Sequence, residues 1–123
     1  MAKWANDALM DAGLAYIQAC DKMAACSQQP ATYTEAFTTY MLANTAMTPT
    51  TDFPLSDGAS GRKTTVAAKS GVTITNSGTA THVALGLASG TTLRAITTCT
   101  SQALTAAGTV DFPAWTWQIG DPS

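Results

Sequence analysis

Turn-forming residues recur at hairpin spacing from residue 48 to the C-terminal part of the chain. They are Pro49, Pro54, Gly58, Gly61, Gly71, Gly78, Gly90, Gly108 and Pro113. Several segments between them alternate apolar or β-branched residues with polar ones, which is the period-2 pattern of a half-buried strand. Short strands joined by tight turns restrict this part of the chain to an antiparallel β architecture.

The segment from residue 81 to residue 87 shows this alternation most clearly. Its apolar face carries Val and Leu, whereas the opposite face carries the small residues Ala80, Ala84 and Gly86 together with His82. A face of small side chains allows another sheet or subunit to approach closely.

The first part of the chain has helical periodicity. Apolar residues recur at steps of three and four from Leu9 through Met10 and Leu14 to Ile17. This stripe predicts an amphipathic helix over residues 2–20 that docks on the sheet or on a neighbouring subunit. We expect a short buried strand or extended link over residues 23–27.

The following segment fits either a helix or a strand. Thr32 and Glu35 have the spacing of a capping box, whereas Tyr33, Phe37 and the threonines near them tolerate a strand. We predict a helical turn that leads into an extended segment over residues 41–47.

These patterns predict one α+β domain over residues 1–123, in which the N-terminal amphipathic helix packs on a small antiparallel β-sandwich of five to six strands. Residues 1–47 form a helical and extended part, and residues 48–123 form a β-rich part. A chain of 123 residues and 12.7 kDa has the size of a single domain.

Charge is unusually scarce. Asp, Glu, Lys and Arg make up 11% of the chain, against about a quarter in a typical globular protein. The six basic residues are scattered and the net charge is −2, which argues against nucleic-acid binding. No apolar run reaches the roughly 18 to 20 residues of a membrane span, so we expect no membrane partner. The first seven residues lack the pattern of a signal peptide, so we expect the protein to stay in the cytoplasm where it is made.

The side chains that carry enzyme chemistry are also few. The chain has one histidine, eight carboxylates and three cysteines at non-repeating spacings, so we expect no enzymatic activity, no metal and no cofactor. His82 is interpreted as structural, with a ligand role across a symmetry axis as the alternative. The cysteines are interpreted as buried thiols, and a bond between Cys26 and Cys99 or between subunits is the alternative.

Large aromatic and apolar side chains are the candidates for an interface. Two tryptophans at i, i+2 on a strand are typical of a core or an interface, although such a pair can also stack on a sugar ring. The interface candidates are Trp4, Leu9, Leu14, Ile17, His82, Trp115 and Trp117.

Four segments of the chain are similar in sequence to segments of a known class of proteins. They are residues 4–7 (Trp-Ala-Asn-Asp) with the helix that follows, residues 70–85, residues 97–105, and residues 110–115 (Val-Asp-Phe-Pro-Ala-Trp). In these segments, and above all in the strand Gly-Thr-Ala-Thr-His-Val-Ala-Leu at 78–85, the chain resembles small virion structural proteins of tailed bacteriophages. The resemblance implies a protein made in the bacterial cytoplasm and built into the virion, with the major capsid protein or other virion proteins as partners.

Low charge and abundant Thr, Ala and aromatic residues suit a permanent interface in a symmetric oligomer. We therefore expect a capsid decoration protein that stabilises the outer head surface as a homo-oligomer, with a trimer expected by analogy. A neck, tail or short-fibre component that binds the host surface is the alternative. A carbohydrate-binding module is a further alternative.

Metal analysis tests the expectation that no cofactor is needed. After dialysis against a chelator, the purified protein is expected to hold no stoichiometric metal and to keep its circular dichroism spectrum. A tightly held zinc or calcium ion whose removal unfolds the protein contradicts this expectation.

Overall fold

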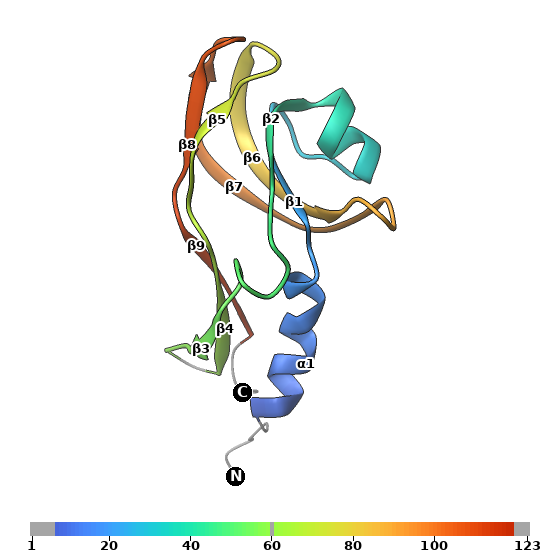
Figure 1. Cartoon of the computed structure of the whole chain (residues 1–123), viewed down its shortest axis with the longest axis vertical. Coiled ribbons are helices and arrows are strands. Elements are labelled where there is room, and N and C mark those ends of the chain that lie inside the picture. The colour runs from blue at the N-terminus through green and yellow to red at the C-terminus, as the bar shows by residue number, and fades with distance from the viewer. Residues whose placement is uncertain (1–6, 60, 120–123) are drawn as a thin grey trace.

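Helix α1 (Asp7–Gln18) opens the part of the chain that the computed structural model describes, which is residues 7–59 and 61–119 (Figure 1). Met10, Leu14 and Ile17 are buried on one side of it, as the stripe predicts. Leu9 does not belong to this stripe and is 68% exposed, because a helix turns about 100° per residue and Leu9 precedes Met10 directly. Residues 2–6 of the expected helix lie outside the described residues.

The first sheet has four antiparallel strands in the order β2-β1-β6-β7. They are β2 (Met41–Ala46), β1 (Lys22–Cys26), β6 (Gly78–Leu87) and β7 (Thr92–Leu104). The extended segments predicted over residues 23–27 and 41–47 are therefore strands, and they belong to the same sheet as the two hairpin strands β6 and β7. The N-terminal part and the β-rich part share this sheet.

The second layer is a long paired ribbon that faces the first sheet (Figure 1). Its strands are β3 (Leu55–Asp57), β4 (Arg62–Val66), β5 (Lys69–Thr73), β8 (Thr109–Phe112) and β9 (Trp115–Ile119). Strand β4 pairs with β9 and with β3, and β5 pairs with β8, all antiparallel.

The structure is an α+β fold, as predicted, but it has nine strands among the described residues where five or six were expected. Two long strands account for part of the difference, because each is interrupted and counts twice. One break lies between β4 and β5 at residues 67–68. The other lies between β8 and β9 at residues 113–114, where Pro113 cannot donate a ladder hydrogen bond.

The main core fills the space between the two layers. Its buried side chains come from α1, both layers and the connection before β3, and they include Ile17, Met23, Phe53, Val66 and Leu85. A second, smaller cluster lies on the outer face of the first sheet, under the π-helical turn η1 (Glu35–Thr39). The predicted capping contact is present, because the Glu35 N–H donates to Thr32 Oγ1 at 3.1 Å.

The small-residue face predicted for β6 is covered by the chain itself. A Cβ on Gly86 would lie 2.6 Å from Cε2 of Phe37, so the aromatic ring occupies the space that another subunit was expected to fill. Ala80 does not share a face with Ala84, and the ladder with β7 is irregular between Ala80 and His82. Ala80 consequently packs in the main core and Ala84 in the outer cluster.

Replacing Leu14 with Asp tests the docking of α1. The Leu14 side chain is fully buried, and a buried carboxylate without a partner is expected to lower the free energy of unfolding by about 3 kcal/mol or more. Leu9→Asp on the exposed face of the same helix is the matched control and should change it by about 0.5 kcal/mol or less. Equal stability of the two variants in denaturant titrations contradicts the observed packing.

Candidate functional site

The two layers are joined along one side and open along the other. On the joined side, Ala43 of β2 forms a bridge with Ile74, and the N–H groups of Thr75 and Asn76 donate to the carbonyl of Leu42. On the other side, β7 has a ladder only with β6, and β8 and β9 have ladders only with β5 and β4, as far as the described residues extend. Two strand edges therefore face each other without pairing.

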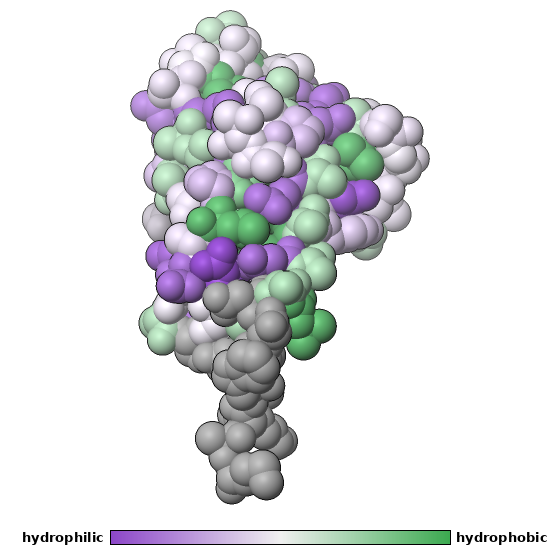
Figure 2. Space-filling model, turned by 60° about the horizontal axis from the view of Figure 1, so that its bottom comes forward, coloured by the Kyte–Doolittle hydropathy of each residue, from purple (hydrophilic) through white to green (hydrophobic). Residues whose placement is uncertain are grey.

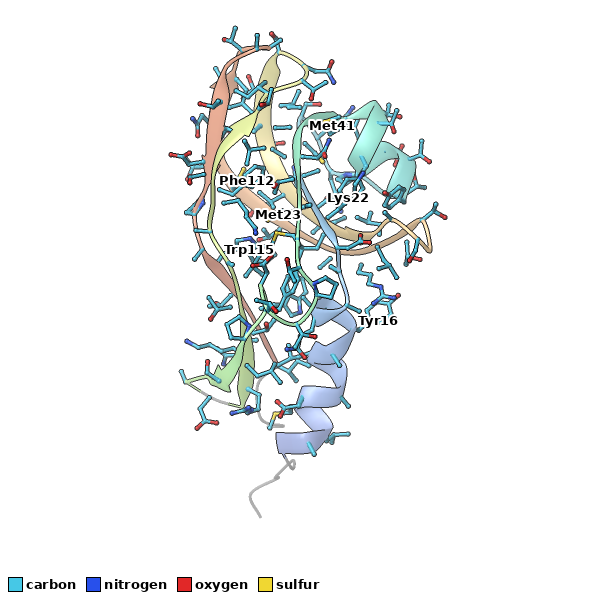
Figure 3. The ribbon with its side chains drawn as sticks, viewed as in Figure 1. Tyr16, Lys22, Met23, Met41, Phe112 and Trp115 are labelled. Carbon is cyan, nitrogen blue, oxygen red and sulfur yellow. The ribbon has the colours of Figure 1, made fainter. Side chains whose placement is uncertain are left out.

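An apolar groove runs along this open side, and we call it the seam. It consists of two adjoining hollows of about 190 and 330 Å³. The residues that line it and that matter below are Val83, Cys99, Thr100, Phe112, Pro113 and Trp115. Phe112 and Trp115 point from the second layer toward the first sheet (Figure 3).

A bulge in β7 explains why the edge is irregular here. Ala80 pairs with Gln102 and His82 pairs with Thr98, so Thr81 of β6 faces three residues of β7, at positions 99–101. A bulge of this kind takes the extra residues out of the ladder and bends the strand. Cys99 and Thr100 consequently line the seam, and Thr100 is exposed.

The tryptophan pair of β9 packs at the boundary between the core and the seam. The two indole rings meet edge to face, with centroids 6.3 Å apart and an interplanar angle of 71°. Trp115 and Trp117 are half-buried against the main core, and Trp115 also lines the seam. Trp115 Nε1 is buried and has no hydrogen-bond acceptor among the described residues.

The other interface candidates occupy different surroundings. Leu14 and Ile17 are core residues of this chain and are not exposed to a partner, whereas Leu9 is exposed on α1. His82 is half-buried on β6, with its Nδ1 2.8 Å from Thr81 Oγ1. Trp4 lies outside the described residues. Sequence reasoning placed the tryptophans on one strand face, but it did not find the seam.

The cysteines are all thiols, and burial makes two of them unreactive at neutral pH. Desolvation raises the pKa of Cys20 to about 11 and that of Cys26 to about 11. Burial also raises the pKa of Cys99 in the seam. Across residues 7–59 and 61–119, no three His, Cys, Asp or Glu residues gather where they could hold a metal ion.

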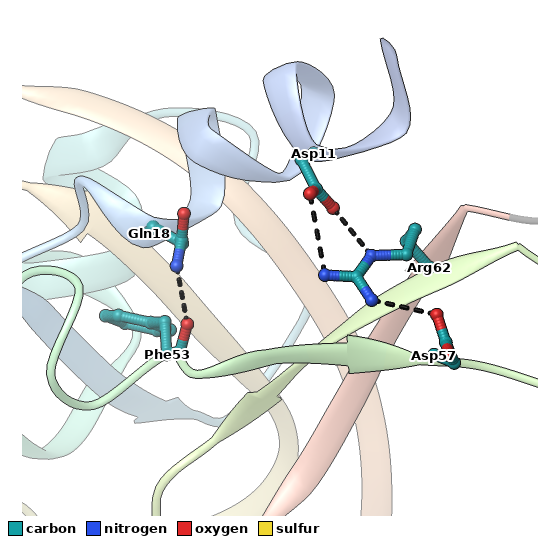
Figure 4. A network of polar contacts seen from close by, with 5 residues as sticks. All are labelled: Asp11, Gln18, Phe53, Asp57 and Arg62. Carbon is teal, nitrogen blue, oxygen red and sulfur yellow. Dashed lines mark hydrogen bonds and ion pairs between the residues drawn. The ribbon is translucent and has the colours of Figure 1, made fainter. Parts of the chain in front are cut away.

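A polar network fixes α1 against the second layer (Figure 4). Arg62 of β4 donates from Nε to Asp11 Oδ1 at 2.9 Å and from Nη1 to Asp57 Oδ1 at 2.8 Å. The Gln18 side chain donates to the carbonyl of Phe53 at 2.7 Å. The helix is therefore held in its N-terminal half and at its C-terminal end, beside β4 and β9 at one end of the molecule (Figure 1).

A second polar contact holds the segment between β2 and β3. The Asp52 carboxylate accepts from the backbone N–H of Thr48 at 2.6 Å and from Lys69 Nζ at 2.9 Å. The hydrogen bond from Thr48 lowers the pKa of Asp52, and Lys69 adds to this effect.

On the face in Figure 2, much of the area has the pale colours of near-neutral hydropathy, with purple groups scattered between them. In the part of the chain that is described, no helix has the length and apolar character needed to cross a membrane.

Comparisons with known proteins leave the site to be interpreted from its own geometry. No family model, curated protein or solved structure matches this chain.

The Asp52 contacts predict a pH-dependent contribution to stability. Because the pKa of Asp52 is lower in the folded protein, the stabilisation is present at neutral pH and is lost as the pH falls through that pKa, below about 4. Asp52→Asn is expected to lower the free energy of unfolding by about 1 to 2 kcal/mol at pH 7. The difference from the unmodified protein should shrink in acid.

Asp57→Asn is the matched control for this prediction. The side chain of Asp57 is 80% exposed although it also contacts an arginine, so its replacement should have a much smaller effect at pH 7. Denaturant titrations at several pH values measure both variants, and a deficit for Asp52→Asn that stays constant down to pH 2 contradicts the assignment.

Proposed function

We propose that this protein is a non-enzymatic structural component of a tailed-phage virion, which acts through protein–protein contacts as a capsid decoration protein. The observation that carries the non-enzymatic part is the chemistry of the seam. Its walls are mostly apolar side chains and threonines, with Gln102 and the exposed Asp111 at one end. They come from two strand edges that have no ladder with each other in the described part of the chain, and not from a cluster of reactive groups. Such a groove is suited to binding another polypeptide.

The scarcity of charge supports the same proposal. A permanent interface is depleted in charged residues at its centre, and the chain has only 11% of them. Residues 70–85, 97–105 and 110–115 resemble segments of virion structural proteins. This resemblance is the reason for proposing a phage particle as the place where the protein acts. Each of these segments contains residues that border the seam, at Val83, at Cys99 and Thr100, and at Phe112 and Pro113.

The location on the particle has a second candidate, a neck, tail or short-fibre component. The same low charge and the same seam support it, and the number of copies per particle distinguishes the two. The carbohydrate-binding alternative is disfavoured by the tryptophan geometry. The rings of Trp115 and Trp117 are half-buried and meet at 71°, so they do not form the flat platform on which a sugar ring stacks.

Particles made without the gene test the decoration proposal. They should still assemble, but they should release their contents at a lower temperature or after osmotic shock, because many weak contacts repeated over a shell stabilise the assembled state by mass action. Electron microscopy of complete particles should show copies in the hundreds on the head. Particles that lack the protein and are equally robust, but fail to adsorb to cells, indicate the fibre alternative instead.

A further inference from the structure

We propose that Arg94 of β7 binds an acidic side chain of a different protein, and that Tyr16 and Trp117 beside it supply part of the surrounding contact surface. The inference rests on the proposed role in protein–protein contacts, because it names the chemistry of one such contact. Its test uses purified protein and defined peptides. Its failure therefore leaves the virion proposal standing, and failure of the virion proposal does not change what the peptides bind.

The guanidinium group of Arg94 is held in place by the C-terminal half of α1. Its Cζ lies 3.9 Å from the centroid of the Tyr16 ring, and its Nη1 donates to the carbonyl of Tyr16 at 2.8 Å. A planar group that is already stacked and hydrogen-bonded loses little freedom when it binds a further group. The cation is therefore oriented before a ligand arrives.

Arg94 has hydrogen-bond donors that the described part of the chain does not use. Nε is buried without an acceptor, and Nη2 has no acceptor among residues 7–59 and 61–119. The other arginine of the chain, Arg62, donates to the carboxylates of Asp11 and Asp57. A guanidinium group has five N–H donors and pairs well with a carboxylate. An incoming carboxylate reaches Arg94 from the side of Nη2, because Nε is covered.

The carboxylates from residue 11 to residue 111 already accept hydrogen bonds within the chain. They are Asp11 and Asp57 with Arg62, Asp52 with Lys69, and Asp21, Glu35 and Asp111 with backbone N–H groups. A second copy would have to give up one of these contacts to offer the carboxylate to Arg94. A different protein is therefore the source that we propose.

The hollow beside Arg94 has the composition of an interface. It has a volume of about 370 Å³, and the residues that line it with Arg94 are Gln29, Leu93, Ala95, Ile96 and Trp117. Tyr16, on which Arg94 stacks, is 52% exposed although it is large and partly apolar. Arg, Tyr and Trp are the residue types that most often dominate the binding energy of protein interfaces.

The charge of the hollow favours a carboxylate over a phosphate. Phosphate groups carry up to two negative charges and are usually held by several cations or backbone N–H groups. Arg94 is the one charged residue in this lining among the described residues, and the whole chain has a net charge of −2. A Glu or Asp side chain with apolar neighbours suits both the single cation and the apolar wall beside it.

Two blocked peptides test the proposal, acetyl-Gly-Leu-Glu-Leu-Gly-amide and the same peptide with Gln in place of Glu. The Nε–H groups of Arg62 and Arg94 give separate signals in nitrogen-15 NMR spectra, so Arg62 is an internal reference. At low salt the Glu peptide should shift the Arg94 signal to saturation while the Arg62 signal stays in place. It should bind at least about tenfold more tightly than the Gln peptide, since hydrogen bonds between charged groups are the strong ones.

Variants show which groups are responsible, with the indole N–H signal of Trp117 as the readout. Arg94→Gln should remove the preference for the Glu peptide, and Arg94→Lys should lose most of it, because an ammonium group keeps the charge without the planar donors. Tyr16→Ala should weaken binding of the Glu peptide. Lys63→Gln is the matched control, since it removes a positive charge of β4 outside the hollow and should change binding by less than about twofold. Thermal unfolding curves show that each variant is folded.

Four results overturn the proposal. The first is an Arg94 signal that does not move with the Glu peptide at concentrations up to about 10 mM, which is beyond the range of weak specific binding. The second is equal binding of the two peptides. The third is an unchanged preference for the Glu peptide in both Arg94→Gln and Arg94→Lys. The fourth is self-association in ultracentrifugation that Arg94→Gln abolishes, because the carboxylate then comes from a second copy.

Discussion

Strand β1 is buried on both faces, and the two clusters of apolar side chains depend on it. Met23 and Ala25 belong to the main core between the layers, whereas Ala24 and Cys26 belong to the outer cluster under η1. Because side chains alternate along a strand, the four consecutive apolar residues after Lys22 supply both clusters at once. A charge at any of these four positions would be buried without a partner.

The residue between α1 and β1 connects this buried strand to the rest of the first sheet. The Asp21 N–H donates to the carbonyl of Gly86, and the Asp21 carbonyl accepts from the N–H of Met47. Its carboxylate accepts from the N–H of Ala88 at 2.8 Å. These three bonds join the start of β1 to the ends of β6 and β2, so the helix, the central strand and both of its neighbours meet at one residue.

The sequence predicted the elements that carry strong periodicity. The stripe of Met10, Leu14 and Ile17 defined the helix, and alternation defined β6, because in both cases one face is buried continuously. The predicted position of Ala80 was wrong, because the regular alternation of β6 does not continue through the irregular part of its ladder with β7, and such an irregularity leaves no mark in the pattern of one strand. The contact between Phe37 and Gly86 was not predicted either, because the two residues are far apart in the sequence and meet only in the folded chain.

The seam could not be predicted for a related reason. Its residues come from three separate segments, around Val83, around Cys99 and around Phe112, and none of these segments is unusual by itself. Whether two strands pair or stay apart depends on how both layers twist and where each ladder breaks. The tryptophans could be assigned to a core or an interface from the sequence, and Trp115 belongs to both, at the main core and at the seam.

The bulge also decides what the free edge of β7 is able to bind. A long, regular free edge pairs with any exposed strand, and natural proteins often interrupt such edges with bulges and polar side chains. Here the bulge at residues 99–101 limits any regular ladder to short pieces, and the exposed side chains from Thr100 to Gln102 are polar. Main-chain pairing alone is therefore weak along this edge, and stable binding needs side chains that enter the apolar groove beside it. An edge of this kind selects its partner by the side chains of a short segment, which is how a surface with very little charge can still be specific.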